Sequence, residues 1–469
     1  MTDAQTFTYA DLFAGIGGFA AVLRGMGGQH AYAVEIDKPA AAVYERVWGH
    51  SSLGDITKDA TDELVTIPQH DIVAGGFPCQ PFSKSGAQKG MDEIRGTLFF
   101  NIMENILHNK PTLFVLENVR NLVGPRHRHE WEVIIDRLQK AGYQVSETPA
   151  IFSPHMIDPA FGGAPQVRER VFITGTLVPE GHVADPHVAP VALPAHVKMN
   201  REWNLEHDLP LLDDEDPRTA GTALSADEEM WIDHWEEWVQ VLREMRARDA
   251  DKAGETARRL PGHPIWANVW TVDKKKRDVM WAEAPAWKRD SLQKNWDLYD
   301  AMRERCDKKW LTRWLRKTRT FPESRQKLEW QAQDETELWS CVISLRPSGL
   351  RAKRMTHLPA LVAITQTPII GPRKRRLAPR EAARLQGLPD SFDFGDQRDA
   401  LTYKQLGNGV NVGVVWNVLK AHVERDRELL LATEKGRTLY SAISGAPARP
   451  PATMLPIAES ELAPIPSAL

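Results

Sequence analysis

The sequence is poor in cysteine: its 469 residues include only Cys79, Cys306 and Cys341, and their spacing does not fit a metal site. So few cysteines exclude a disulfide framework and predict a reducing compartment, the cytoplasm. The N-terminus lacks the basic and apolar segments of a signal peptide. No apolar run is long enough to span a bilayer, so no membrane partner is expected.

The chain also lacks an excess of positive charge. Its 59 Lys and Arg residues are balanced by 63 Asp and Glu residues, which gives a net charge of -4. Overall charge therefore does not predict a nucleic-acid partner, and only local basic clusters can argue for one. The hydrophobic content of 42% and the charged content of 26% are those of an ordinary globular protein, long enough for two or three domains.

A glycine-rich turn near the N-terminus predicts a nucleotide-like ligand. Residues 6–13 have the pattern of a strand, Ala14–Gly18 that of a tight turn, and residues 19–26 the composition of a helix. Such a turn presents backbone N–H groups and a positive helix end to a ligand. Glu35 ends the next apolar run, about 20 residues on, where an acid can bind ribose hydroxyls, and Asp55 ends a third. A simple packing turn is the alternative, but two acids at successive strand ends favour a nucleoside-containing cofactor.

A second turn places a cysteine at the end of a strand. The apolar residues 71–74 are followed by Gly75–Pro78, which cannot continue the strand, and then by Cys79. The carboxyl ends of strands are where α/β sheets carry their chemistry, although an isolated cysteine is more often a small buried apolar residue. The polar, glycine-bearing segment from Ser83 to Arg95 is expected to close over a site.

Two further strand patterns carry charged groups. Residues 111–116 form an apolar run that ends in Glu117. Partial desolvation there raises the pKa of a carboxyl group and suits it to hold a proton near neutrality, unless it is a paired structural carboxylate. Further on, residues 166–172 largely alternate between polar and apolar side chains. Gln166, Arg168 and Arg170 are therefore predicted to share one face of a strand. They are either surface charge or a means of holding an anion or a base.

Taken in order, six motifs resemble those of the DNA (cytosine-5)-methyltransferases. They are residues 11–19 (Asp-Leu-Phe-Ala-Gly-Ile-Gly-Gly-Phe), 78–80 (Pro-Cys-Gln), 117–119 (Glu-Asn-Val), 166–170 (Gln-Val-Arg-Glu-Arg), 376–389 and 407–410 (Gly-Asn-Gly-Val). The resemblance covers about residues 7–175 and 340–420. It implies a class I α/β fold, a doubly wound sheet with a smaller target-recognition lobe. It also implies methyl transfer from S-adenosylmethionine to carbon 5 of a flipped-out cytosine in a short, specific sequence of double-stranded DNA.

The resemblance also implies roles for single residues. Cys79 would attack carbon 6 of the cytosine, protonated Glu117 would stabilise ring nitrogen 3, and Arg168, with Arg170 in the same group, would hold the ring carbonyl. The implied cofactor is S-adenosylmethionine, without a metal. The residues implied to hold it are Phe13, Ala14, Gly15, Ile16, Gly17, Gly18, Glu35, Ile36, Asp55, Ile56, Pro78, Leu98, Asn408 and Gly409. The residues implied to contact DNA are Ser83, Ser85, Gln88 and Arg95.

The region between the motif blocks is expected to form the recognition lobe, over residues 186–398, with a helical insertion. Trp231, Trp235 and Trp238 recur at helical spacing, which favours a buried stripe over a base-stacking surface. Basic clusters suggest a cleft that tracks phosphates. They lie at residues 274–277, 313–317 and 373–376.

The motif order also predicts how the domains are built. Residues 1–185 are expected to form the catalytic domain, residues 399–434 to return and complete it with a helix at 411–425, and residues 435–469 to be a flexible tail. The first motif lies close to residue 1, as in prokaryotic members paired with a restriction endonuclease. A cognate endonuclease is therefore expected, and a monomer is expected because the enzyme would act on one flipped base.

Other functions remain as alternatives at this stage. A tRNA cytosine-5 methyltransferase would share the fold and the cysteine, but the long recognition region and the basic clusters favour duplex DNA. A DNA-binding protein without catalysis would not need Cys79, Glu117 and Arg168. A nicotinamide dehydrogenase would leave the Pro-Cys-Gln turn unexplained.

Overall fold

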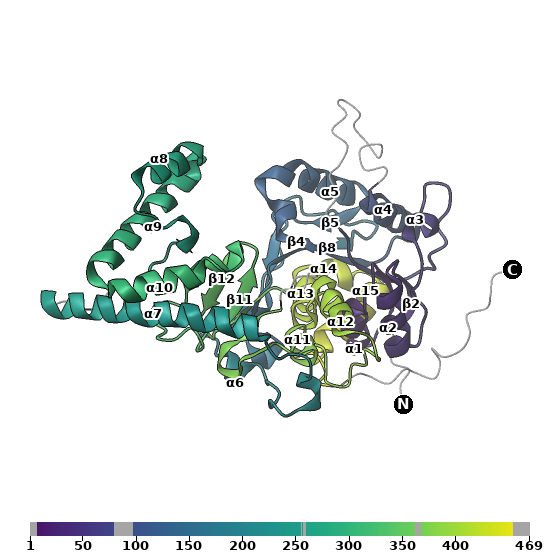
Figure 1. The fold of residues 1–469 in the computed structure, drawn as a ribbon. Helices are drawn as coiled ribbons and strands as arrows, with labels where there is room; N and C mark the ends of the chain where they lie inside the picture. The colour runs from purple at the N-terminus through teal and green to yellow at the C-terminus, as the bar shows by residue number, and fades with distance from the viewer. Residues whose placement is uncertain (1–6, 79–96, 255, 257–258, 362–366, 454–469) are drawn as a thin grey trace.

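The computed structural model describes residues 7–78, 97–254, 256, 259–361 and 367–453 of the chain. Cys79 and the segment that was expected to close over the site lie outside these residues. Two lobes are visible in Figure 1, one built on a large sheet and one that carries the long helix α7 (Ala226–Ala253). Within the described residues, no helix is long and apolar enough to cross a membrane.

The first lobe is built on a seven-stranded sheet in the order β2-β1-β3-β4-β8-β5, with β6 also paired to β8. Its strands are β1 (Thr8–Leu12), β2 (Gln29–Val34), β3 (Ile72–Gly76), β4 (Leu113–Val119), β5 (Tyr143–Val145), β6 (Ala150–Phe152) and β8 (Arg170–Leu177). The first four strands run parallel, and β8 is antiparallel to β4. Parallel strands bury both faces under helices, which explains why their sequences read as continuous apolar runs.

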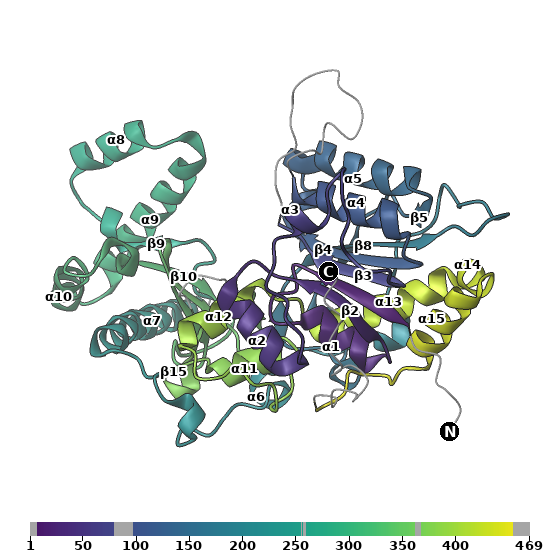
Figure 2. The same ribbon diagram turned by 90° about the vertical axis from the view of Figure 1, so that its right-hand side faces the viewer.

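Helices cover both faces of this sheet, which confirms the predicted doubly wound α/β fold. One face packs against α1 (Gly18–Gly25), α2 (Lys38–Trp48), α13 (Val412–Arg425) and α15 (Glu434–Gly445). The other face packs against α3 (Ile56–Asp59), α4 (Leu98–Asn109) and α5 (Arg128–Lys140). Figure 2 shows α4 and α5 on one side of the strands and α1, α13 and α15 on the other. Helix α13 is the helix expected at residues 411–425.

The second lobe, residues 226–376, is built on a six-stranded sheet in the order β15-β14-β11-β12-β10-β9. Its strands are β9 (Ile265–Trp266), β10 (Lys327–Gln331), β11 (Val342–Arg346), β12 (Gly349–Lys353), β14 (Ile369–Ile370) and β15 (Arg375–Arg376). Its other helices are α8 (Lys274–Glu283), α9 (Ala286–Arg305) and α10 (Lys308–Thr318). Trp235 and Trp238 are fully buried in the core that the helices share with this sheet, so the tryptophan stripe is core, as expected.

The chain between the two sheets packs mainly on the first lobe. Residues 191–209, which include α6 (Leu205–Asp208), belong to the same apolar core as α1 and α13. Residues 377–394, with α11 (Pro379–Leu385), join that core as well, and α12 (Asp399–Asn408) follows them. The separate core of the second lobe takes residues from Ile232 to Ile369.

One predicted strand is interrupted. β7 (Gln166–Val167) pairs with β13 (Leu358–Pro359) in a small separate sheet, whereas β8 begins at Arg170 in the large sheet. Arg168 and Glu169 lie between the strands, so the expectation that Gln166, Arg168 and Arg170 share one strand face is wrong. The chain changes sheet partner at this point, and a period of two no longer applies across the change.

The expected flexible tail is also partly wrong. Residues 434–445 form α15, which packs on α13 and on α14 (Arg427–Leu431). Leu439 and Ile443 on this helix are fully buried. Burial of these two side chains, rather than high helix propensity, holds α15 in place.

Candidate functional site

Of the predicted catalytic residues that the structure describes, Glu117 lies near the carboxyl end of β4, beside that of β3, and Arg170 starts the neighbouring β8. In the register of β3 and β4, Gly76 lies opposite Glu117. A Cβ atom on Gly76 would lie 3.3 Å from Oε2 of Glu117, so the glycine lets the carboxyl group lie close to the backbone of β3. The next residue, Asn118, donates a hydrogen bond of 2.9 Å from Nδ2 to the carbonyl oxygen of Phe77. The strand end that leads into Cys79 is thus tied to the Glu-Asn-Val segment.

Glu117 is buried and has a guanidinium partner. Nε of Arg170 lies 2.9 Å from Oε1 of Glu117. Burial raises the pKa of Glu117, and the charges of Arg170 and Arg168 together with the hydrogen bond from Arg170 offset only part of this rise. The carboxyl group therefore holds its proton to a higher pH than an exposed glutamate, as a proton donor to a heterocycle requires.

Arg168 is held differently. Its Nη2 donates to the carbonyl oxygens of Gly407 at 3.0 Å and Gly409 at 2.7 Å, and its Nη1 donates to that of Leu361 at 3.4 Å. Burial and the nearby charge of Arg170 lower the pKa of Arg168 to about 10. The side chain expected to hold the cytosine carbonyl is instead bound to backbone on both sides of Asn408. Arg168 lies in the break between β7 and β8, outside the strand that Arg170 begins, although the charges of both arginines act on Glu117.

The glycine turn and Glu35 form a second group of site residues, next to the first. The backbone N–H of Gly15 donates to Oε2 of Glu35 at 2.9 Å, and the N–H of Asp37 donates to Oε1 at 2.7 Å. Gly15 has a φ of 56°, and nothing lies within 4 Å of where its Cβ would be. Gly17 is different, because a Cβ there would lie 1.9 Å from the indole nitrogen of Trp48. The turn is thus packed on one side and open on the other.

The open side has an apolar border. Ile36 is 71% exposed and Leu53 is 54% exposed, although Leu53 directly follows the buried Ser52. Pro78 and Asn408 are also exposed, whereas Phe13, Gly15 and Leu98 are half-buried. Exposed aliphatic side chains beside a carboxylate suit a ligand with a flat base and sugar hydroxyls. S-adenosylmethionine fits this set of residues.

Some residues predicted to hold the cofactor have other roles in the structure. The carboxylate of Asp55 caps α3 by accepting from the backbone N–H of Thr57 at 3.1 Å and from its hydroxyl at 2.7 Å, which lowers the pKa of Asp55. Because Asp55 is only half-buried, an oxygen remains open to a ligand. Ala14, Ile16, Gly17, Gly18 and Ile56 are buried and form the floor below the open turn.

The last motif returns to both groups, as the motif order predicts. A Cβ on Gly18 would lie 2.7 Å from Cγ2 of Val410, and one on Gly76 would lie 3.9 Å from Cγ1 of the same valine. Val410 therefore fills the space between the glycine turn and the end of β3. Nζ of Lys404 lies 2.6 Å from Oδ2 of Asp37, which ties α12 to the start of α2. Asn408 and Gly409 are thus brought next to the turn that holds Gly15.

Sequence reasoning missed Asn118, Val410 and Lys404. Both Asn118 and Val410 lie inside motifs named above. The amide of Asn118 near a strand end and the branched side chain of Val410 after a helix could have indicated them. Lys404 gave no signal, because its partner Asp37 is far away in the sequence.

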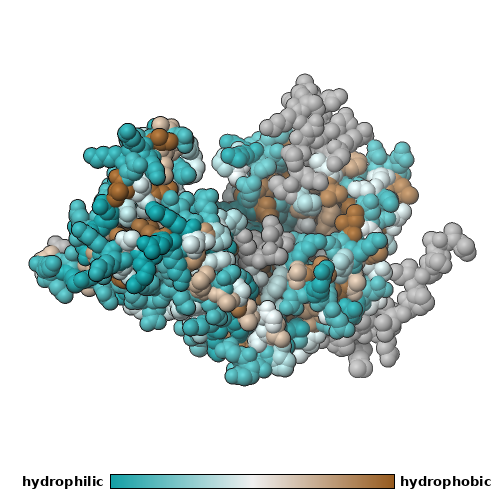
Figure 3. Space-filling view, viewed as in Figure 1, coloured by the Kyte–Doolittle hydropathy of each residue, from teal (hydrophilic) through white to brown (hydrophobic). Residues whose placement is uncertain are grey.

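The basic cluster at residues 373–376 does not line a cleft. Arg375 forms a bidentate pair with the buried Glu381, at 2.8 and 3.0 Å, and Arg376 is paired with Glu228. Arg375 is thus bound to α11, which packs on the first lobe, and Arg376 is bound to α7 of the second lobe. Lys274, Lys275 and Lys276, by contrast, are exposed on α8. Figure 3 shows a hollow in the surface between the lobe that carries α8 and the first lobe.

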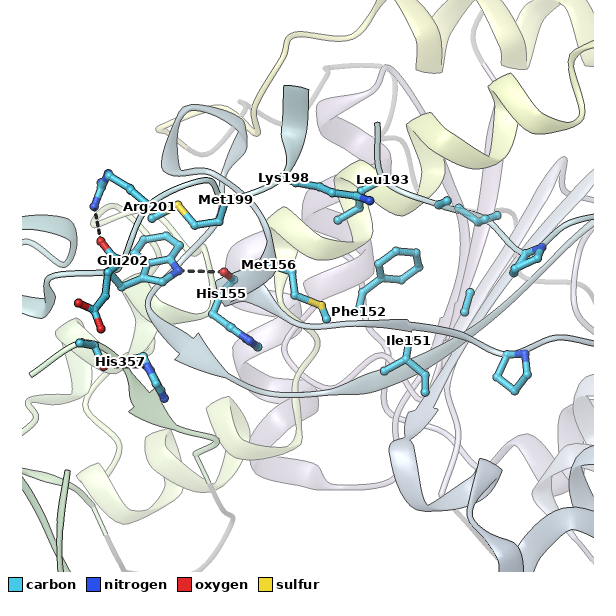
Figure 4. Close-up of a pocket in the computed structure, with 17 residues that line it drawn as sticks. Ile151, Phe152, His155, Met156, Leu193, Lys198, Met199, Arg201, Glu202 and His357 are labelled. Carbon is cyan, nitrogen blue, oxygen red and sulfur yellow. Dashed lines mark hydrogen bonds between the residues drawn. The ribbon is translucent and has the colours of Figure 1, made fainter. Parts of the chain in front are cut away.

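A cavity of about 690 Å³ lies elsewhere, where residues 190–203 cross β6. Figure 4 shows Phe152, Met156 and Leu193 on its apolar side and His155 and His357 near its other end. None of the predicted site residues lines it. Among the described residues, no group of three or more His, Cys, Asp or Glu side chains could hold a metal ion.

The chain is similar to known proteins over most of its length. The family described as "C-5 cytosine-specific DNA methylase" matches residues 7–424. The type II methyltransferase M.AluI of Cellulosimicrobium cellulans is 46% identical over 93% of this chain and 96% of its own length. The type II methyltransferase M.HhaI of Haemophilus parahaemolyticus is 39% identical over 35% of this chain and 47% of its own length. The crystal structure of a putative DNA modification methyltransferase from an E. coli prophage is 19% identical, with a TM-score of 0.43 over 89% of this chain and 99% of its own.

Proposed function

This chain belongs to the C-5 cytosine-specific DNA methylase family, and from that premise we propose how its residues methylate carbon 5 of a cytosine in DNA. The observation that carries the proposal is the buried pair of Glu117 and Arg170, at the end of β4 and beside the strand that leads into Cys79. The enzyme is a DNA (cytosine-5-)-methyltransferase. Its similarity to type II methyltransferases supports a role in restriction-modification.

The reaction begins with Cys79. Carbon 5 of cytosine is a poor nucleophile, because the ring is aromatic. Addition of the Cys79 thiolate to carbon 6 breaks the aromaticity and moves an electron pair to carbon 5 and ring nitrogen 3. Since this chemistry is impossible inside a stacked duplex, the cytosine is flipped out first. After methyl transfer a base removes the proton from carbon 5, and elimination expels the Cys79 thiolate.

Glu117 and Arg170 act on the other edge of the ring. Protonated Glu117 donates to ring nitrogen 3 as electron density builds up there. Arg170 holds this carboxyl group in place and, as a second donor, faces the ring carbonyl. Arg168 is a positioning residue, because its contacts go to Gly407 and Gly409 and thereby fix Asn408.

S-adenosylmethionine supplies an electrophilic methyl group when it is bound. Glu35 would take its ribose hydroxyls, since each carboxylate oxygen retains an acceptor site beyond the backbone N–H that it already binds. Ile36 would pack on the adenine, with Asp55 toward the amino group. Gly15 and Asn408 would hold the methionine part, and Pro78 and Leu98 would line the same pocket.

Double-stranded DNA is the substrate, and the roles of Ser83, Ser85, Gln88 and Arg95 at its backbone remain proposals, because these residues lie outside the described part of the chain. The enzyme would act as a monomer in the cytoplasm, bound to the nucleoid through DNA. It would protect host DNA from a cognate restriction endonuclease.

Bisulfite sequencing of a plasmid from cells that express the chain tests this function. Methylated cytosines confined to one short sequence, and absent with Cys79→Ala, are the expected result. A plasmid without methylation, despite folded protein that binds S-adenosylmethionine, would refute the DNA substrate. Methylation that persists with Cys79→Ala would refute the nucleophile.

A further inference from the structure

One face of the second-lobe sheet is apolar and the other is polar. Leu328, Ile343 and Leu350 turn toward α7 and α10 and belong to the second core. The residues that alternate with them point the other way, and paired residues on neighbouring strands share a face. The polar face carries Glu329, Gln331, Ser344, Arg346, Arg351 and Lys353.

This polar face is turned toward the first lobe. Val342 pairs with Lys353 on one side and with Ile370 on the other, so the three residues share a face. Val342 and Ile370 are buried in the core of the first lobe. Figures 1 and 2 both show the sheet between α10 and the first lobe. The polar face therefore starts where the two lobes touch, and it extends from Lys353 toward β10.

The polar face is also close to the reaction site. Leu358 pairs with Gln166, four residues before Arg170. Leu358 lies five residues after Lys353, and five steps along the chain reach at most about 18 Å. That distance equals about five base pairs at roughly 3.4 Å each. A duplex that presents its cytosine to Glu117 would therefore pass over β11 and β12.

The positive charge on this face is only partly neutralised. Nε of Arg351 donates to Oε2 of Glu329 at 2.6 Å. Arg346 and Lys353 are half-buried, yet within the described part of the chain neither side chain has a hydrogen bond or an ion pair. Burial, and next the charge of Arg351, lower the pKa of both. Half-buried cations that repel one another call for a partner from outside the chain.

The mixture of groups on the face identifies that partner. A surface that only follows phosphates needs cations alone, whereas base edges in the major groove offer both acceptors and donors. Here two arginines and a lysine lie beside a carboxylate, an amide and a hydroxyl. The pair of Arg351 and Glu329 is fixed before DNA arrives, so little side-chain freedom is lost on binding.

We propose that this face reads the base edges of the target sequence, and that Arg346 and Arg351 each take a guanine. The proposal rests on the proposed function and adds to it the residues that select the sequence. It also places the recognition surface away from the basic clusters at residues 313–317 and 373–376. The first of these clusters lies on α10, which covers the opposite face of the sheet.

The test uses the purified full-length chain and duplexes that carry the methylated sequence or one of its single-base replacements. Arg346→Gln and Arg351→Gln are each expected to lower kcat/KM on the natural sequence by about 10- to 100-fold and to abolish the preference for guanine at one position. Arg346→Lys should lose less of this preference than Arg346→Gln, because a lysine can still donate to guanine O6 and N7 but lacks the flat bidentate fork. Its retained charge also guards against loss of folding.

Arg303→Gln is the matched control, because Arg303 is an exposed arginine of the same lobe on α9 and lies outside the basic clusters. Its sequence preference and its rate should equal those of the natural chain. A natural preference in all three test variants would overturn the inference. So would an equal loss on every duplex together with a weaker salt dependence, which marks a phosphate contact. If the natural chain methylates no duplex at all, the proposed function fails instead.

Discussion

Nε of Arg170 lies 2.9 Å from Oε1 of Glu117, between the end of β4 and the start of β8. Because these strands are antiparallel neighbours, with Arg170 opposite Val119, the contact runs diagonally and joins the Glu-Asn-Val motif to the Gln-Val-Arg-Glu-Arg motif. The guanidinium holds the carboxyl group in place, while burial keeps its proton available. The position and the protonation of Glu117, the proposed catalytic acid, thus come from two different causes.

Replacing Glu117 by Gln should lower kcat by at least about 100-fold, since general-acid assistance contributes about this much or more. The amide keeps the shape of the side chain but cannot give up a proton to ring nitrogen 3. Binding of duplex DNA, measured by fluorescence anisotropy, should change by less than threefold. A variant with the natural kcat would show that Glu117 is not the acid.

The pH dependence of kcat should report Glu117. The acid must be protonated, and its pKa is raised above the ordinary value of 4.5, so activity is lost as the pH increases through this raised pKa. A pH profile of single-turnover methylation should therefore contain a descending limb that disappears in Glu117→Gln. If the limb persists in that variant, another group produces it.

Arg168 and Arg170 should differ in what their substitution changes. Arg168→Leu leaves the carbonyl oxygens of Leu361, Gly407 and Gly409 without their donor, which should reduce the free energy of unfolding by about 3 kcal/mol and weaken S-adenosylmethionine binding at Asn408. Arg170→Lys should lower kcat with little effect on cofactor affinity. Chemical denaturation and calorimetric titration separate the two, and equal effects would contradict distinct roles.

Gly15→Ala should affect the cofactor more than the fold. Its φ of 56° makes an alanine strained, by about 1 kcal/mol, but no atom of the described protein stands in the way of the Cβ. Gly27 is a matched control, since its φ is 90° and the space around it is equally empty. Both variants should lose similar stability in thermal unfolding, and only Gly15→Ala should raise the KM for S-adenosylmethionine.

Two truncations should distinguish the contribution of α15 to stability from that of the residues after it. A chain that ends at residue 453 should unfold at the natural temperature. A chain that ends at residue 433 loses the buried side chains of Leu439 and Ile443, which should remove about 3–6 kcal/mol of stability. Circular dichroism during heating measures this. Equal unfolding temperatures would mean that α15 contributes nothing to the core.

Several site residues could be predicted because their signals are local. Gly15 and Glu35 belong to a strand-turn-helix pattern, and Glu117 stands where an apolar run stops. In each case the strand end itself places the side chain at the edge of a parallel sheet. Cys79 was predicted from the same kind of local signal, a strand end followed by a turn, although Cys79 itself lies outside the described residues.

Other features could not be predicted, because they depend on partners far away in the chain. Arg168 and Arg170 are the same residue type in one motif, and only the change from β7 to β8 separates their roles. The basic run at residues 373–376 resembles a DNA-binding surface in the sequence. In the structure, Glu381 and Glu228 neutralise two of its residues, Arg375 and Arg376. The half-buried Arg346 and Lys353 gave no sequence signal at all.

By itself, the sequence determined the family, the reaction and the turns that carry its groups, because backbone geometry and apolar periodicity act over a few residues. Only the tertiary structure decided which arginine faces Glu117, which charges are already paired, and that α15 belongs to the core. Those outcomes depend on which surfaces pack together, and burial and charge pairing are set by neighbours in space rather than in sequence.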